Sequence, residues 1–453
     1  MDAADLAFAG LARQAELVRA GEVSSRELTE LYLDRIARLD PRLNAYRAVL
    51  AEEALANADA ADRRRGDDAP PLNGVPIAIK DDTDVEGQVT AHGSLAHDFV
   101  PAADAEVVRR LRAAGTVILG KTNVPELEAL PMTESLAFGA TCNPWDPART
   151  SGGSSGGSGT AVAAGLCAAA LATDGAGSIR IPAAACGLVG LKPQRDRVPM
   201  GGNWYGMAVC GALTRGVRDT ALFLDAVKDG GPAYADVAPP GALRIAYSVA
   251  MPRGATGRLE TEQRDAVIAT AERLRGLGHH VEERDPDYGT VAANVVTRYL
   301  EGVNGDAEGM PHPELLARWT RGLAGLGAKI PGPLVRRAHA QEAADRDKLN
   351  TLLAEFDAML LPTLTRRPPR VGEWLGQPAP LMLNNMANLT AHLALWNHTG
   401  QPAISVPADP AADGFPVGVQ LVGPPDGEPR LLALAAQLED VTGWTARRPP
   451  EPA

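Results

Sequence analysis

The run SGGSSGGSGTAVAAGLCAAALAT occupies residues 151–173 and contains no charged side chain. It carries six glycines, seven alanines and four serines, so its side chains take up little volume. The run is about as long as a membrane-spanning helix, but its Ser/Gly-rich first half would place polar groups in lipid. We therefore expect the run to be buried within protein, with a tightly packed helix over residues 160–170 and a loop over residues 171–174.

Helices and short apolar strands alternate on both sides of this run. Upstream, Ser24 and Glu27 have the spacing of a helix-capping box, and residues 74–80 are typical of a buried strand that ends at Lys80. Downstream, residues 260–277 have the pattern of an amphipathic helix. This interleaving predicts an α/β fold with helices layered around one sheet.

The composition is that of an ordinary globular protein, with 45% hydrophobic and 22% charged residues in a chain of 453. The formal net charge of −12 argues against direct nucleic-acid binding. The first residues lack the basic segment of a secretory signal, so we expect a cytoplasmic location. The four cysteines form no CxxC pair, and the histidines lack carboxylates at ligand spacing, so we expect no metal site.

Two short motifs match other chemistries but lack the required context. Residues 115–122 fit the phosphate-loop pattern GxxxxGK[ST], yet the four intervening residues TVIL are themselves a strand. Residues 152–156 fit the GxSxG nucleophile elbow of the α/β-hydrolases, yet turn-forming residues precede them where that motif needs a strand. We therefore expect neither a nucleotide-binding loop nor a nucleophile elbow.

Lys80 and the segment 173–182 together indicate hydrolase chemistry. Three small residues before Ser178 allow successive backbone amides to converge on one point, which an oxyanion hole requires. Asp174 and Arg180 are the charges beside this neutral stretch, and they must pair if they are buried. A serine nucleophile needs a base, and a desolvated lysine can act as one. Each element alone is equally explained by a solvated lysine or a surface loop, but the combination favours a lysine-driven serine hydrolase.

These segments resemble the amidase signature family over nearly the whole chain. The matching motifs are GVPIAIKD at 74–81, KTNVPE at 121–126, NPW at 143–145, GGSSGGS at 152–158, DGAGSIR at 174–180 and GLVGLKP at 187–193, with weaker similarity at 400–407 and 416–420. The resemblance implies an α/β fold with a single large mixed β-sheet flanked by helices on both faces. It also implies one domain over residues 1–453, a signature core at 60–230, and a more variable helical segment at 286–350 that shapes the substrate pocket.

The resemblance further implies a Ser-Ser-Lys triad. Ser178 matches the nucleophile, Ser154 the bridging serine and Lys80 the base. In the family the bridging serine follows a cis peptide bond, which here joins residues 153 and 154. The oxyanion-hole amides match Gly175, Ala176, Gly177 and Ser178, and the supporting residues match Ser155, Asp174 and Arg180.

Two positions depart from the family pattern. Ala176 stands where the family usually has the first of two glycines, and it retains a backbone N–H donor although it lacks the conformational freedom of glycine. Asp196, in the stretch QRDRV at 194–198, stands where the family often has glycine. The first change leaves the oxyanion hole intact, whereas the second predicts an altered loop away from the triad.

The activity implied is hydrolysis of a linear, non-peptide amide through an acyl-enzyme on Ser178, with release of ammonia or an amine. The expected partner is a small-molecule amide, without a cofactor, a metal, a nucleic acid or a membrane, and a homodimer is left open. Two alternatives also stay open: the glutaminase A subunit of a tRNA-dependent amidotransferase, and a catalytically silent binding protein on the same scaffold. The candidate pocket residues, each equally explained by loop or core packing, are Glu128, Met132, Trp204, Tyr205, Trp396 and Asn397.

Overall fold

A mixed sheet runs through the centre of the molecule. The structure is a computed structural model that describes residues 1–64, 66, 68–202 and 204–451. In these residues the main sheet has eleven strands, in the spatial order β1 (Tyr46–Val49), β3 (Val117–Thr122), β2 (Pro76–Lys80), β8 (Ala169–Asp174), β10 (Val209–Thr214), β9 (Val189–Lys192), β14 (Ala403–Pro407), β15 (Gly418–Val422), β13 (Ala358–Pro362), β11 (Arg244–Tyr247) and β12 (His280–Glu283). Parallel pairs such as β2–β8 lie beside antiparallel pairs such as β8–β10, which confirms the predicted mixed sheet.

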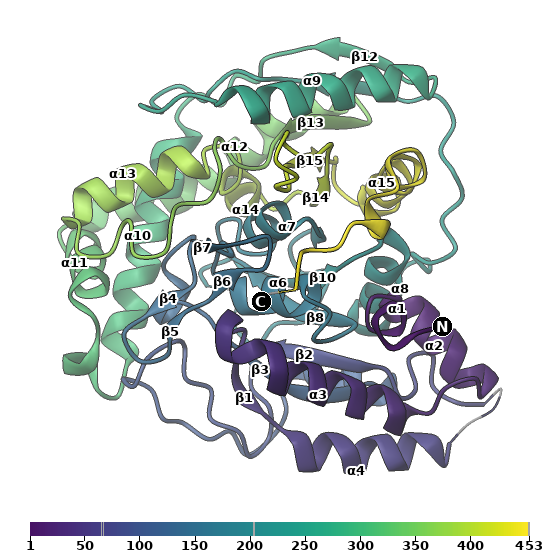
Figure 1. The fold of residues 1–453 in the computed structure, drawn as a ribbon. Helices are drawn as coiled ribbons and strands as arrows, with labels where there is room; N and C mark the ends of the chain where they lie inside the picture. Colours follow the sequence, from purple (N-terminus) through teal and green to yellow (C-terminus); the bar gives the residue numbers. More distant parts are fainter. Residues whose placement is uncertain (65, 67, 203, 452–453) are drawn as a thin grey trace.

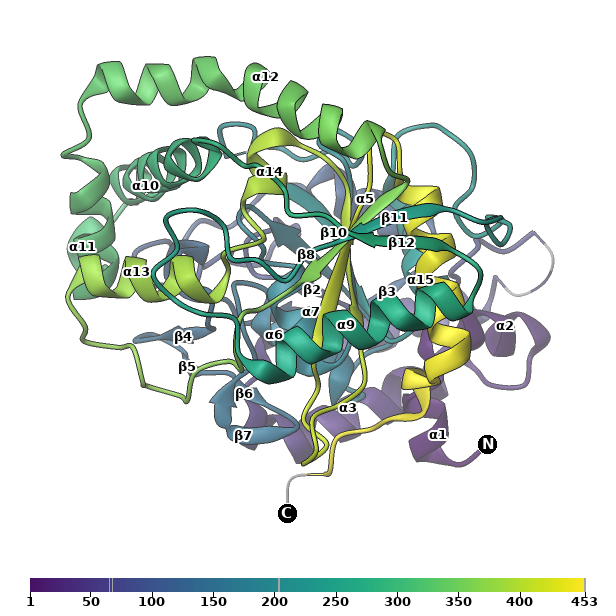
Figure 2. The ribbon, with the colours of Figure 1, turned by 90° about the horizontal axis from the view of Figure 1, so that it is seen from above.

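Helices flank this sheet on both faces, as predicted (Figure 1). In chain order they are α1 (Ala3–Ala7), α2 (Gly10–Ala20), α3 (Ser25–Leu43), α4 (Ala51–Asp62), α5 (Glu106–Ala113), α6 (Gly156–Ala163), α7 (Arg180–Cys186), α8 (Val217–Val227), α9 (Thr261–Gly276), α10 (Val291–Gly309), α11 (Arg318–Gly327), α12 (Gly332–Ala354), α13 (Ala379–Leu389), α14 (Leu395–Thr399) and α15 (Glu428–Thr442). The 3₁₀ turns are η1 (Glu126–Glu128), η2 (Pro313–Leu315) and η3 (Trp444–Ala446), and the hairpins outside the sheet pair β4 (Glu134–Ser135) with β5 (Gly139–Ala140) and β6 (Cys142–Asn143) with β7 (Asp146–Thr150). Figure 2 shows α10, α11 and α13 gathered at one side of the molecule, away from α2 and α15.

Local sequence signals account for several element boundaries. The predicted capping box begins α3, because the Ser24 hydroxyl accepts from the Glu27 amide at 3.0 Å and the Glu27 carboxylate accepts from the Ser24 amide at 2.7 Å. The strand predicted at residues 74–80 is β2, and it is buried throughout. Among the described residues, no helix is both long and apolar enough to cross a membrane.

The prediction for residues 160–174 is partly wrong. Helix α6 begins at Gly156 and ends at Ala163, the chain turns at Gly165 with φ of 64°, and Ala169–Asp174 form strand β8 instead of a helix end and a loop. Strand β8 lies between β2 and β10, and all six of its residues are buried. Hydrogen bonds to both neighbouring strands outweigh the helical preference of alanine, which is a tertiary effect that propensity does not report.

The parallel pairing of β2 and β8 decides where the chemistry can lie. Ile77 pairs with Ala169 and Ala78 with Ala170, so the carboxyl ends of the two strands reach the same edge of the sheet. Lys80 therefore ends its strand beside the segment in which Thr173 and Asp174 end theirs. The Gly/Ser-rich start of α6 packs close by, because this helix contacts both β2 and β8.

A glycine at the start of α6 permits a close approach to the backbone beside β1 and β3. A Cβ on Gly157 would lie 2.4 Å from the backbone nitrogen of Asn123 and 2.5 Å from the carbonyl oxygen of Ala45. Both contacts are with backbone atoms, so a side chain at this position can be accommodated only if the helix moves away from the sheet.

We expect Gly157→Ala to lower the free energy of unfolding by about 2–3 kcal/mol, because it overpacks a site whose neighbours cannot yield. Gly325→Ala is the matched control: Gly325 lies in α11 with no atom within 4 Å of its added Cβ. That variant should be about 0.5–1 kcal/mol more stable than the parent, because alanine restricts the unfolded chain. Urea unfolding measures both, and equal effects would contradict the packing argument.

Candidate active site

Lys80 is fully buried at the end of β2, and every close partner of its amine is polar. The Lys80 Nζ lies 2.8 Å from Ser154 Oγ, 2.6 Å from Thr173 Oγ1 and 3.0 Å from Asp82 Oδ2. The Thr173 hydroxyl donates to the same Asp82 oxygen at 2.5 Å. The lysine is therefore held by a serine, a threonine and a carboxylate, which satisfies the requirement that a buried amine be hydrogen-bonded.

Asp82 keeps its charge in this setting. Burial opposes its ionisation, but Lys80 and the Thr173 hydroxyl hold the pKa of Asp82 below its usual value. The neighbouring Asp81 points to a different cluster, in which its carboxylate lies 3.0 Å from Lys121 Nζ and 2.5 Å from Arg47 Nε. Lys121 is thus part of a buried ion pair near the end of β3. Residues 117–122 form a strand, which agrees with the prediction that residues 115–122 are not a phosphate-binding loop.

Ser154 lies two residues before the start of α6, and the peptide bond between Gly153 and Ser154 is cis, as the resemblance implies. The next residue, Ser155, links this segment to the second serine loop: its amide donates to the Ser178 carbonyl at 3.3 Å, and its hydroxyl donates to the Thr173 carbonyl at 3.2 Å. The two Gly/Ser segments are therefore held side by side, with Lys80 bonded to the first of them.

The backbone around Ser178 is held in place by hydrogen bonds to Asp174. Ser178 itself lines a recess, which is described below. The Asp174 carboxylate accepts from the amide of Gly177 at 2.6 Å and from the amide of Ile179 at 3.1 Å. Gly177 has φ of 120°, whereas Ala176 is not among the residues with positive φ, so alanine is accommodated where the family usually has glycine. The Gly177 amide is thereby engaged by Asp174, and Ala176 and Ser178 are the loop residues that line the recess.

Asp174 and Arg180 form an ion pair from which solvent is excluded, since both side chains have 0% exposure. Arg180 Nε lies 3.0 Å from Asp174 Oδ2, and Arg180 Nη2 lies 3.1 Å from Oδ1. Burial by itself would raise the pKa of Asp174, but the Arg180 guanidinium holds it well below the usual range. The carboxylate therefore stays ionised and accepts hydrogen bonds from the amides of Gly177 and Ile179.

The recess beside Ser178 is mainly apolar. It has about 770 Å³ of empty space, counting its open mouth, and is lined by η1 and the residues after it, the Ser178 loop, α10, α13 and the start of α14. The described lining residues are Glu128, Ala129, Leu130, Pro131, Ala176, Ser178, Ile181, Ala292, Val295, Val296, Tyr299, Leu383, Met386, Ala387, Thr390, Ala391, Ala394 and Leu395. Helix α10, within the segment 286–350, thus contributes one wall.

Of the six candidate pocket residues, Glu128 lines this recess and the others lie elsewhere. Met132 and Trp396 are buried in the hydrophobic core. Trp204 donates to Asp306 at 2.9 Å, and Tyr205 is about half exposed. Asn397 is buried against Asp174 and not against the recess. The sequence could not separate these roles, because side-chain direction in irregular segments depends on tertiary packing.

Glu128 is the one charged side chain among the described residues that line the recess. His92 Nδ1 lies 3.2 Å from its carboxylate. Burial would lower the pKa of His92, but Glu128 raises it to about 9, so the imidazole is protonated at neutral pH and pairs with the carboxylate. The lining therefore offers a carboxylate and apolar surface, and no lysine or arginine, to a bound molecule.

Two residues that contact Lys80, Asp82 and Thr173, were not predicted as site residues. Asp82 is the second of three carboxylates that follow Lys80, which marked it only as a neighbouring charge, and Thr173 carried no signal beyond its place before Asp174. The described residues contain no group of three or more His, Cys, Asp or Glu side chains placed to hold a metal ion.

Comparison with known proteins agrees with this geometry. The family model described as Amidase matches residues 27–432. The chain is 47% identical over 459 residues to the protein named "Putative amidase AmiB2" of Mycobacterium tuberculosis, with 99% of each chain covered. It is 37% identical to the 6-aminohexanoate-cyclic-dimer hydrolase of Paenarthrobacter ureafaciens, over 96% of this chain and 95% of that one.

A solved structure supports the same assignment. The structure of a 6-aminohexanoate cyclic dimer hydrolase complexed with substrate superposes with a TM-score of 0.88 and 32% identity, covering 98% of this chain and 99% of the other. The fold and the site define an amide-hydrolysing enzyme of the α/β class. The chain belongs to the amidase family, the family of amidase signature enzymes that its motifs resemble.

We expect Asp174→Asn and Arg180→Met each to lower the free energy of unfolding by about 3–5 kcal/mol, because each leaves a buried charge without its partner. The double variant should lose clearly less than the sum, since it removes both charges. Urea unfolding of the four proteins gives the coupling energy. The exposed pair of Glu106 and Arg109, whose atoms lie 2.7 Å apart, is the control and should show no measurable coupling; additivity at Asp174 and Arg180 would contradict the interpretation.

Proposed function

We propose that this protein hydrolyses carboxylic amides that have an uncharged, apolar acyl group, through an acyl-enzyme on Ser178. The observation that carries the proposal is the 2.8 Å contact between the buried Lys80 amine and Ser154 Oγ, beside the loop whose Ser178 lines the apolar recess. Membership of the amidase family supports the reaction type. The substrate class is inferred from the lining of the recess.

In the proposed reaction, neutral Lys80 accepts a proton from Ser154, which takes one from Ser178 as Ser178 Oγ forms a bond to the amide carbon. Asp82, 3.0 Å from Nζ, stabilises the ammonium group formed at Lys80. The C–N bond then breaks, and the proton returns through Ser154 to the leaving nitrogen, so that ammonia or an amine departs. Water enters by the same relay and releases the carboxylic acid.

The oxyanion hole is proposed to use backbone amides of the loop before and at Ser178. Four amides were expected from the resemblance, at residues 175–178. Because the Gly177 amide donates to Asp174, we assign it a structural role and assign the donors facing the substrate to Ala176 and Ser178, with Gly175 beside them. Ser155, Asp174 and Arg180 hold this loop without contacting the substrate.

The lining disfavours the glutaminase alternative. A glutamine side chain ends in the amide, but its far end carries an α-carboxylate, which a site ordinarily holds with a cation. The charged group among the described lining residues is the carboxylate of Glu128. An apolar amide fits the recess, and both linear amides and a cyclic one, such as the dimer named in the relatives, belong in the first substrate panel.

We expect Ser178→Ala to abolish labelling by a fluorophosphonate and to lower kcat by at least about 10³-fold, because it removes the nucleophile. Ser158→Ala is the matched control in the same Gly/Ser region; its hydroxyl donates to the Leu171 carbonyl at 3.1 Å and takes no part in the proposed relay. That variant should still be labelled. Labelling of Ser178→Ala would refute the assignment of the nucleophile, whereas an unlabelled parent protein would favour the silent binding protein.

A second test compares hexanamide with adipamate, a linear amide of the same length that ends in a carboxylate. We expect kcat/KM for hexanamide to be at least about 100-fold higher, because the carboxylate would be desolvated in a recess whose lining holds the like charge of Glu128 and no lysine or arginine, while the nearby His92 is already paired with Glu128. Glu128→Gln should narrow this preference by about tenfold by removing the like charge. A preference for adipamate or glutamine in the parent protein would overturn the substrate class while leaving the reaction type standing.

A further inference from the structure

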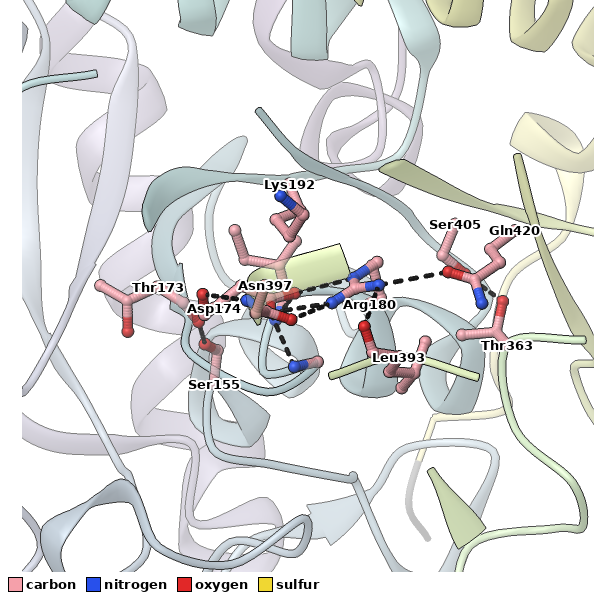
Figure 3. Close-up of polar contacts among 12 residues, drawn as sticks. Ser155, Thr173, Asp174, Arg180, Lys192, Thr363, Leu393, Asn397, Ser405 and Gln420 are labelled. Atoms are coloured by element: carbon pink, nitrogen blue, oxygen red, sulfur yellow. Dashed lines mark hydrogen bonds and ion pairs between the residues drawn. The ribbon is translucent and has the colours of Figure 1, made fainter. Parts of the chain in front are cut away.

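Asn397 is a buried amide at the centre of the hydrogen bonds that fix the Ser178 loop. It lies on α14, more than 200 positions after the loop in sequence, and its side chain is 1% exposed. Its Nδ2 donates to the Asp174 carbonyl at 2.7 Å, to Asp174 Oδ1 at 2.8 Å and to the Met207 carbonyl at 3.2 Å. Figure 3 shows Asn397 lying between Asp174 and Arg180.

The same amide also fixes the arginine. Arg180 Nη2 donates to Asn397 Oδ1 at 2.6 Å, so one side chain contacts both members of the buried ion pair. Arg180 Nη1 is held in turn by the Leu393 carbonyl at 3.1 Å and by Gln420 Oε1 at 3.2 Å. The carboxylate that shapes the loop is thus positioned from the C-terminal third of the chain.

One oxygen connects Asn397 to the reacting loop. Asp174 Oδ1 accepts from Asn397 Nδ2 at 2.8 Å and from the Gly177 amide at 2.6 Å. A rotation of the carboxylate about its side-chain bonds would therefore move the peptide that joins Ala176 to Gly177. Asn397 Nδ2 also donates to the backbone carbonyl of Asp174, so Asn397 fixes both the side chain and the backbone of Asp174.

Arg195, in the stretch that departs from the family pattern, fixes α14 itself. Its Nη2 donates to the carbonyl of Asn397 at 2.9 Å and to the carbonyl of His398 at 2.7 Å. Asp196, next to it, has φ of 64°, the left-handed conformation that a glycine adopts readily and that aspartate tolerates better than most residues. The altered sequence thus keeps a tight turn and places a cation on the carbonyls of α14.

We propose that Asn397 is a positioning residue for the reaction: by fixing Asp174 it holds the loop 174–178 in the conformation that presents its amides to the oxyanion. This inference rests on the proposed function, because it assumes that Ser178 is the nucleophile. It assigns Asn397 a role in the transition state and none in substrate contact, since the side chain does not line the recess.

The test compares variants of Asn397 with a buried amide on the same stretch of chain. Gln401 is 2% exposed, donates to Asn350 on α12 at 2.8 Å and accepts from Thr399, so neither of these hydrogen bonds involves the Ser178 loop. Asn397→Ala removes the donor and the acceptor. Asn397→Asp keeps the shape and the acceptor for Arg180 but places an oxygen against the oxygens of Asp174.

For both Asn397 variants we expect kcat on hexanamide to fall by about 10- to 100-fold with KM changed less than about threefold, a smaller loss than removal of an oxyanion donor itself. The inhibition constant of an alkyl boronic acid, whose Ser178 adduct mimics the tetrahedral intermediate, should rise by the same factor. Gln401→Ala should lower stability but leave kcat and the boronic acid affinity within about twofold of the parent.

The outcomes separate this inference from the proposed function. If the parent protein is labelled at Ser178 and both Asn397 variants are stable but retain kcat and boronic acid affinity, the positioning role is wrong and the nucleophile stands. If Ser178→Ala keeps its turnover, the proposed function fails first. Should Asn397→Ala not fold, Asn397→Asp decides alone, with near-ultraviolet circular dichroism as the check on its fold. A rise in KM as large as the fall in kcat would assign Asn397 to substrate binding and overturn the inference.

Discussion

A fully buried carboxylate, Asp174, is the constraint on which the arrangement of the site depends. A charge without solvent must be surrounded by donors, and this one receives them from the loop that follows it, from Arg180 and from Asn397. Each donor is thereby fixed in turn. As a consequence, the loop 174–178 is held in one conformation by the hydrogen bonds that the ionised Asp174 carboxylate requires.

A second buried polar cluster surrounds Lys80, and the pairing of β2 with β8 places it next to the cluster around Asp174. Strands β2 and β8 run parallel, so that Lys80 ends one strand next to Thr173, which precedes Asp174 in the other. Ser154 reaches the lysine because the Gly/Ser-rich start of α6 packs against these strands, with Gly157 at backbone distance from Ala45 and Asn123 beside β1 and β3. The small side chains of residues 151–173 are therefore explained by the close packing of α6 against the sheet. The absence of charged residues in this run is explained by the burial of α6 and β8.

The polar clusters and the apolar recess lie on different sides of Ser178 and have different proposed roles. Charges and hydroxyls lie behind Ser178, where they hold the backbone and, in the proposed reaction, relay protons. The surface offered to a bound molecule is mainly apolar, and Glu128 is its one charged side chain among the described residues. This separation follows from the fold, since α10 and α13 supply the apolar wall and the sheet edge supplies the polar one. Variation in those two helices can change the substrate without disturbing the loop.

The sequence by itself determined the class of fold and the residues of the proposed site. Alternating helix and strand patterns predicted helices layered around one sheet, and the family resemblance implied that the sheet is mixed. Lys80, Ser154, Ser178, Asp174 and Arg180 were proposed because they stand in short motifs that match those of the family. The stretch that forms β8 was predicted as a helix end and a loop, because its pairing with β2 and β10 involves partners far away in sequence. Only the tertiary structure decided that Asn397 faces Asp174 and not the recess, and which residues line that recess. Side-chain direction in irregular segments follows from packing between elements 200 and more positions apart, and no local pattern encodes it.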